Sequence, residues 1–178
     1  MKRIGSGIVA LLLLGCSNGT LLAQGPSSQS DARQLLGVWE LVSIEVRGAQ
    51  GEQSLWLGPH PTGTITYSPG GRMAVQFMGD PRPVVATPNA WQGRQINPAV
   101  PIDELHDALG GYYAYFGTYS VDFVKHVVVH HIRASLHPSE VGIDYERPYR
   151  FEGDLLILRY PAGGGATRTI TFRKAEQF

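Results

Sequence analysis

Four histidines lie close together in the stretch KHVVVHHIRASLHP, residues 125–138. His126, His130, His131 and His137 fall within twelve positions of a chain that has six histidines in all. Imidazole nitrogens bind metal ions, and imidazole exchanges protons near neutral pH. The stretch could therefore form a metal site, supply catalytic bases, or be an ordinary strand that carries histidines.

The backbone that carries these histidines decides whether they can share a metal ion. Three valines separate His126 from His130 and Ile132 follows, and β-branched runs of this kind favour a strand. On a strand the two histidines lie roughly 13 Å apart, at about 3.3 Å per residue, whereas zinc binds an imidazole nitrogen at about 2.0 Å. His131 points to the opposite face of the strand. We therefore expect no metal site and no cofactor.

Alternation along three strands instead predicts a shared interior wall. In the strand at 126–136 the apolar face is taken as the interior, namely Val128, His130, Ile132, Ala134 and Leu136. In the strand at 143–151 the acids belong in water, which places Arg147 inside. An enclosed arginine is costly unless it meets a polar or anionic partner, so Arg147 and His130 are predicted to be the polar anchors of a ligand cavity. The predicted ligand-binding residues, including one from a loop at the mouth, are Tyr113, Tyr115, Tyr119, His130, Tyr145, Arg147 and Trp91.

The elements that must position these residues form an all-β pattern. Eight β-patterned runs are separated by turn residues, at 37–47, 62–68, 71–78, 112–122, 126–136, 143–151, 155–160 and 167–174. Short links such as Ser68-Pro69-Gly70-Gly71, expected to be a type II turn, indicate an antiparallel up-and-down meander. Eight such strands usually close into a barrel. The insertion 79–111, with one short helix after Pro101, is expected to be a lid over one mouth of the barrel or simply a plug.

The N-terminus predicts export. Lys2 and Arg3 precede an apolar run too short to span a bilayer, so residues 1–23 are expected to be a signal peptide. The alternative is a lipobox cut before Cys16, the only cysteine, which would then be lipidated. The protein would be periplasmic, and anchored to the outer membrane if Cys16 carries lipid. Residues 24–35 are expected to be a polar tether, and 36–178 a single domain.

Charge and composition exclude several partners. The chain has 15 basic and 15 acidic residues, and removal of the signal peptide leaves a net charge of −2, so we expect no nucleic-acid partner. No nucleophile motif or glycine-rich phosphate loop is present in the sequence. Contact with a membrane is expected only through a lipid anchor.

Several motifs together resemble the bacterial and fungal lipocalin-like domain family. They are LLGVWELVS, GPHPTGTITYSPGGRMAVQFM, YFGTYSV, VVVHHIRASLHPSEVG and RPYRFEGDLLIL. The resemblance covers about residues 36–174 and implies an eight-stranded barrel with an internal cavity. It also implies that Trp39 closes the base of the cavity, with Arg173 from the last strand packed over its indole.

Three functions remain open on the sequence alone. The first is a barrel that binds a small apolar or amphipathic molecule. The second is a small cyclase or isomerase that uses His130 as proton donor or acceptor, with Arg147 or a tyrosine holding a developing oxyanion. The third is a structural envelope protein whose barrel is filled by side chains.

Overall fold

The structure, a computed structural model, describes residues 26–176, with side chains from Ser30 onward. The expected signal peptide and Cys16 lie outside the described residues. In chain order the elements are α1 (Pro26–Leu35), β1 (Gly37–Arg47), β2 (Gln53–Leu55), β3 (Thr62–Tyr67), β4 (Arg72–Met78), β5 (Trp91–Gln92), β6 (Gln95–Ile96), α2 (Ile102–Gly110), β7 (Tyr112–Asp122), β8 (Val127–Ser135), a 3₁₀ turn (Pro138–Glu140), β9 (Asp144–Glu152), β10 (Leu155–Gly163) and β11 (Ala166–Lys174).

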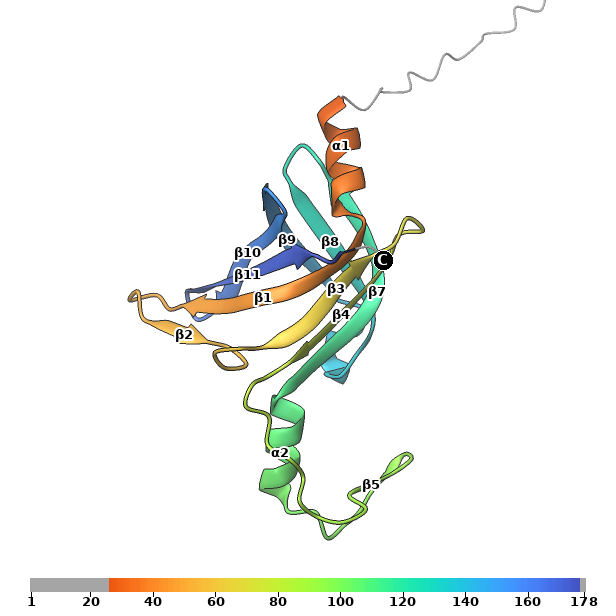
Figure 1. Cartoon of the computed structure of the whole chain (residues 1–178), viewed down its shortest axis with the longest axis vertical. Coiled ribbons are helices and arrows are strands. Elements are labelled where there is room, and N and C mark those ends of the chain that lie inside the picture. The colour runs from red at the N-terminus through yellow and green to blue at the C-terminus, as the bar shows by residue number, and fades with distance from the viewer. Residues whose placement is uncertain (1–25, 177–178) are drawn as a thin grey trace, which may run out of the picture.

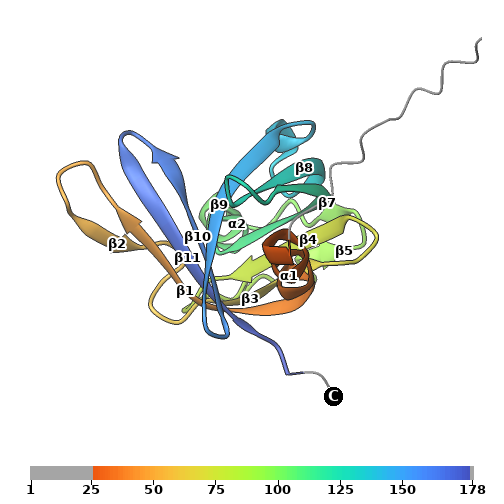
Figure 2. The same ribbon diagram turned by 90° about the horizontal axis from the view of Figure 1, so that it is seen from above.

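Eight of the strands form a closed antiparallel barrel. Neighbours in the sheet follow the order β11-β10-β9-β8-β7-β4-β3-β1, and β11 also pairs with β1, which closes the ring. Seen from above, the strands surround a common centre (Figure 2). The short strand β2 pairs with the far end of β1 and stands outside this count. The expected eight-stranded up-and-down barrel is confirmed.

The β3–β4 hairpin is present, but its turn differs from the expected type. A type II turn needs a positive φ at Gly70, whereas the positive φ of 71° is at Gly71. Ser68 and Arg72 pair across the loop, with the Ser68 amide donating to the Arg72 carbonyl at 2.9 Å. The loop therefore has three residues and uses the second glycine for its left-handed position.

The segment expected to be a polar tether forms α1, which stands at one end of the barrel (Figure 1). Proline is favoured in the first turn of a helix, and here Pro26 begins it. Leu35, its last residue, is buried, and the indole Nε1–H of Trp39 donates to the Leu35 carbonyl at 2.8 Å. Burial of Leu35 against the barrel explains why the segment is not a free tether.

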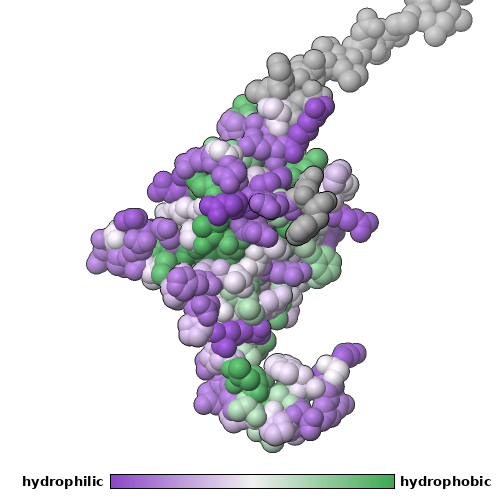
Figure 3. Space-filling model, in the orientation of Figure 1, coloured by the Kyte–Doolittle hydropathy of each residue, from purple (hydrophilic) through white to green (hydrophobic). Residues whose placement is uncertain are grey.

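The insertion 79–111 joins β4 to β7 at the other end of the barrel and projects away from it (Figures 1 and 3). It contains the β5–β6 hairpin and the expected short helix, α2, which ends where the Gly111 amide donates to the Asp107 carbonyl. No helix within residues 26–176 is long and apolar enough to cross a membrane.

A β-bulge in β8 changes which side chains face inward. Phe116 pairs with Ala134 but Gly117 pairs with Ile132, so Arg133 is an extra residue. A Cβ on Gly117 would lie 2.0 Å from the His131 carbonyl oxygen, so only glycine allows this close approach. The predicted inward direction is right for Val128, His130 and Ile132, which are buried. It is wrong for Ala134 and Leu136, which lie past the bulge and line an outer hollow.

Candidate functional site

The barrel contains a cavity of about 260 Å³ that is open to solvent and lies at the end where α2 joins β7. One part of its wall is apolar and comes from β3, β4, β10 and β11: Ile65, Val75, Phe77, Leu158, Pro161, Ala162, Ile170 and Phe172. The rest carries phenols and charges: Tyr113, Tyr115, Glu140, Tyr145, Arg147, Tyr160 and Arg168. Such a mixture of apolar surface and a few converging polar groups is typical of ligand pockets.

Four of the seven predicted ligand-binding residues line this cavity. They are Tyr113 and Tyr115 from β7 and Tyr145 and Arg147 from β9. Alternation holds on both strands, so these side chains share the inner face as expected. The other three, namely Tyr119, His130 and Trp91, lie elsewhere.

His130 lies behind the cavity wall and does not reach the cavity. Its imidazole is fully buried, with Nε2 2.7 Å from the Tyr67 hydroxyl and Nδ1 2.9 Å from the Tyr115 hydroxyl. A neutral imidazole has one N–H donor and one bare nitrogen, so one tyrosine accepts a hydrogen bond and the other donates one. Because both ring nitrogens are engaged, His130 cross-links β3, β7 and β8.

Burial fixes the protonation states of this network. Desolvation lowers the pKa of His130 well below its usual value, and the nearby charge of Arg147 lowers it further. Desolvation likewise raises the pKa of Tyr67 and of Tyr115, although Arg147 opposes the shift at Tyr115. At neutral pH the network is therefore uncharged.

Tyr119 and Trp91 are also outside the lining. The Tyr119 hydroxyl donates to the Ser68 carbonyl at 2.9 Å and its ring packs edge-on against Tyr67, so it closes the wall beside the β3–β4 hairpin. Trp91 begins the hairpin of the projecting insertion and is 52% exposed. The lining contains no residue of 79–111, so the insertion does not cover the cavity as the expected lid would.

Arg147 lies over two aromatic rings. Its guanidinium carbon is 4.4 Å from the ring centroid of Tyr145 and 3.8 Å from that of Tyr160. The guanidinium also donates a hydrogen bond to the Glu146 backbone carbonyl at 3.1 Å. Cation–π contacts stabilise a partly desolvated cation without neutralising its charge.

A second arginine in the cavity was missed by the sequence analysis. Arg168 on β11 lies with its guanidinium carbon 4.2 Å from the ring centroid of Trp56, and the Trp56 ring in turn packs edge-on against Tyr113. Alternation could have found it, since Arg168 shares a face with Ile170 and Phe172, two apolar residues of the same strand.

Glu140 is the third charged group of the lining and was also missed. It ends the 3₁₀ turn after β8 and accepts hydrogen bonds from Ser135 Oγ at 2.6 Å and from the Tyr113 hydroxyl at 3.0 Å. Burial alone would raise the pKa of Glu140, but hydrogen bonds from Ser135 and the tyrosines outweigh it and hold the pKa below its usual value. Glu140 is therefore ionised at neutral pH.

Trp39 lies at the opposite, closed end of the barrel. It is buried and stacks against Phe151 with ring centroids 5.8 Å apart. The cation over its indole is Lys174, with Nζ 4.2 Å from the ring centroid, and not the predicted Arg173. Arg173 alternates with the buried Phe172, so it points outward and pairs with Asp154 at 3.3 Å.

The remaining histidines of the cluster lie apart from one another. His131 is on the outer face, bonded to Ser120 at 2.9 Å and to Asp144 at 2.7 Å, and His137 is near Glu140. His126 is in the β7–β8 turn, 3.4 Å from Asp31 of α1. No group of three potential metal ligands occurs in the part of the chain that the structure describes.

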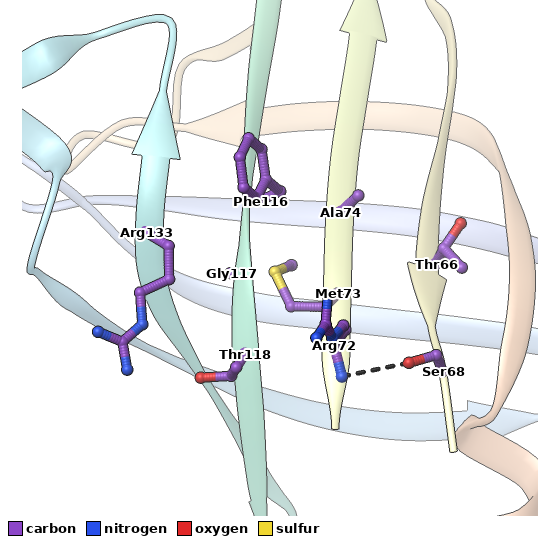
Figure 4. Close-up of a pocket in the computed structure, with 9 residues that line it drawn as sticks. All are labelled: Thr66, Ser68, Arg72, Met73, Ala74, Phe116, Gly117, Thr118 and Arg133. Atoms are coloured by element: carbon purple, nitrogen blue, oxygen red, sulfur yellow. Dashed lines mark hydrogen bonds between the residues drawn. The ribbon is translucent and has the colours of Figure 1, made fainter. Parts of the chain in front are cut away.

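A larger hollow of about 550 Å³ lies on the outside of the barrel, around the exposed ring of Phe116. Figure 4 shows its wall, which comes from β3, β4, β7 and β8 and includes Thr66, Ala74 and Arg133. Its two charged residues, Arg72 and Arg133, are both exposed. The internal cavity is smaller, but it gathers two arginines, an ionised glutamate and several phenols. It is therefore the candidate site.

Three solved barrels are similar to the chain in outline. The first is a redesigned β-barrel, with a TM-score of 0.40 and 14% identity over 82% of this chain and 95% of that one. The second is a de novo fluorescence-activating β-barrel, with a TM-score of 0.38 and 16% identity over 81% of this chain and 96% of that one. The third is a mutant of the fluorescent protein UnaG, with a TM-score of 0.37 and 14% identity over 82% of this chain and 99% of that one.

No curated protein matches the sequence significantly. The sequence profile of the lipocalin-like domain matches residues 36–174, which is the whole of the barrel with its insertion. The chain therefore belongs to the lipocalin-like domain family.

Proposed function

We propose that the protein binds a small amphipathic molecule inside the barrel. The observation that carries this proposal is the internal cavity, with an apolar wall on one side and Arg147 among tyrosines on the other. Its volume of about 260 Å³ is just below the range of roughly 300–1,000 Å³ common for ligand pockets. A compact ring system or a short chain therefore fits better than a long lipid.

The other two functions have less support. A barrel filled by side chains would leave no such cavity. Catalysis by His130 would need the imidazole within reach of a substrate, whereas it lies behind Tyr115 with both nitrogens engaged. The raised pKa of Tyr115, caused mainly by burial, makes this phenol a hydrogen-bond donor and not a base at neutral pH.

The test is calorimetric titration with two small aromatic probes, 2-naphthoate and 2-naphthamide. Ala162 lines the cavity near the end of β10, so Ala162→Trp should fill the entrance and abolish binding. Ala134 lines an outer hollow, so the matched variant Ala134→Trp should bind as the unchanged protein does. If neither probe binds the unchanged protein, or if only Ala134→Trp loses binding, an internal ligand site is wrong. Native mass spectrometry of protein from its own cells would add the mass of any retained ligand.

Export is part of the same proposal and is supported by the N-terminal sequence alone. With Cys16 lipidated, the protein would fractionate with the outer membrane, and Cys16→Ser would release it into the soluble periplasm. Equal distribution of the two forms would favour cleavage after Ala23 instead.

A further inference from the structure

Three side chains on neighbouring strands form a row across the cavity wall. Tyr160 on β10 pairs in register with Arg168 on β11, and the Arg147 guanidinium from β9 lies 3.8 Å from the Tyr160 ring centroid. The Arg168 guanidinium is 5.9 Å from the same centroid. The two cations therefore face one cavity from either side of a single phenol ring.

Neither cation has an anionic partner. Within residues 30–176, no carboxylate lies within ion-pair distance of Arg147 or Arg168. Arg147 interacts with the Glu146 carbonyl and with the Tyr115 phenol. Two buried side-chain atoms in the described part lack any hydrogen-bond partner, and one of them is Nε of Arg168. The other is the Tyr149 hydroxyl, which is outside the lining.

The one carboxylate of the lining is already occupied. Glu140 accepts hydrogen bonds from Ser135 and Tyr113, on the side of the cavity that β7 and the 3₁₀ turn form. Two guanidinium groups and one carboxylate give the lining a net charge of about +1. Arg147 and Arg168 are partly buried, so their charges are less well solvated than in water, and the orphaned N–H adds to this cost. A bound oxyanion would remove both.

We propose that the ligand is a small organic monoanion whose carboxylate or similar oxyanion lies between Arg147 and Arg168. This inference rests on the proposed function and names the chemical class of its ligand. Guanidinium groups stacked on aromatic faces keep their N–H edges free for oxygen acceptors. The apolar residues of β3, β4 and β11 then cover the rest of the molecule.

The two probes separate this inference from the proposed function, because 2-naphthoate and 2-naphthamide have nearly the same shape and differ in charge. We expect the unchanged protein to bind naphthoate at least tenfold more tightly than naphthamide. Arg168→Met and Arg147→Met should each weaken naphthoate at least tenfold and change naphthamide less than threefold. Arg159 on the outer face of β10 gives the matched control, and Arg159→Met should leave both affinities unchanged.

Each outcome decides between the two proposals. Binding of naphthamide as tightly as naphthoate would leave the internal site intact and overturn the anion preference. The same conclusion follows if the arginine variants weaken both probes equally. The comparison of the two probes in the unchanged protein requires no variant to fold, and Arg168→Lys, which keeps the charge, should retain part of the preference for naphthoate.

Discussion

Both ends of the barrel hold a cation over an indole, but the two pairs are satisfied differently. At the closed end, Lys174 lies over Trp39 and its ammonium donates to the carbonyls of Gln34 and Leu36. At the cavity end, Arg168 lies over Trp56, and its Nε has no partner. The closed end is complete without a ligand, whereas the cavity end is not. We assign the saturated pair to the scaffold and the unsaturated pair to the proposed ligand site, because a buried polar group without a partner needs an explanation.

Removal of each indole should give the largest difference in stability between the two ends. Trp39 is buried and lies under the Lys174 ammonium, so Trp39→Ala should lower the free energy of unfolding by about 3–5 kcal/mol. Trp56 is only half-buried, so Trp56→Ala should cost about 1 kcal/mol and act mainly on ligand affinity. Urea unfolding followed by circular dichroism measures both. Equal losses at the two ends would contradict the distinction.

The next largest effect is expected at the buried histidine. His130→Leu leaves the hydroxyls of Tyr67 and Tyr115 without their partner, and each buried unsatisfied group costs about 1–3 kcal/mol. We expect a loss of about 2–4 kcal/mol in the free energy of unfolding. His131 on the outer face is the control, and His131→Leu should cost less than about 1 kcal/mol because its contacts with Ser120 and Asp144 are exposed to solvent. Unfolding curves showing similar losses for the two variants would argue against the network.

The depressed pKa of His130 also predicts how the unfolding free energy changes with pH, including the sign of that change. Its pKa in the folded state is depressed, mainly by burial, so below an unfolded pKa of about 6.5 the unfolded chain binds the extra proton. Stability therefore falls as the pH drops below about 6.5, by up to about 1.4 kcal/mol per pH unit from this group. The difference in unfolding free energy between the unchanged protein and His130→Leu should shrink over the same range. A constant difference from about pH 7 to about pH 5 would show that His130 does not titrate differently in the folded and unfolded states.

The sequence predicted the barrel well because the fold depends on repeated local patterns. Alternation and turn residues located all eight barrel strands and placed Arg147 and Tyr145 on the inner face. The same rule, applied to β11, would have replaced Arg173 by Lys174 at the base and added Arg168 to the cavity. The inward faces of Arg168 and Lys174 are therefore both encoded in the local pattern of the last strand.

Other features depend on tertiary contacts that alternation does not describe. The bulge at Arg133 reverses the faces of Ala134 and Leu136, and it depends on the close approach of β8 to Gly117. Glu140 reaches the cavity only because a 3₁₀ turn follows β8. Alternation gives the face of His130 but not its depth, which is set by the two tyrosines that cover it.

The smallest predicted effect is the change in unfolding free energy when the cation of each pair is removed. It gives the most direct test of the two cation–indole pairs, because this change differs in sign between them. Lys174→Met removes two hydrogen bonds from a charged donor to the carbonyls of α1 and its neighbour, and should cost about 1–2 kcal/mol of unfolding free energy. Arg168→Met removes a partly buried charge and an orphaned N–H while keeping an unbranched chain over Trp56, so the empty protein should keep its stability or gain up to about 1 kcal/mol. Thermal and urea unfolding of both variants, without and with naphthoate, would measure this. Stability gained at the cost of ligand binding is the expected behaviour of a binding residue, and a loss at Arg168 as large as at Lys174 would make Arg168 part of the scaffold instead.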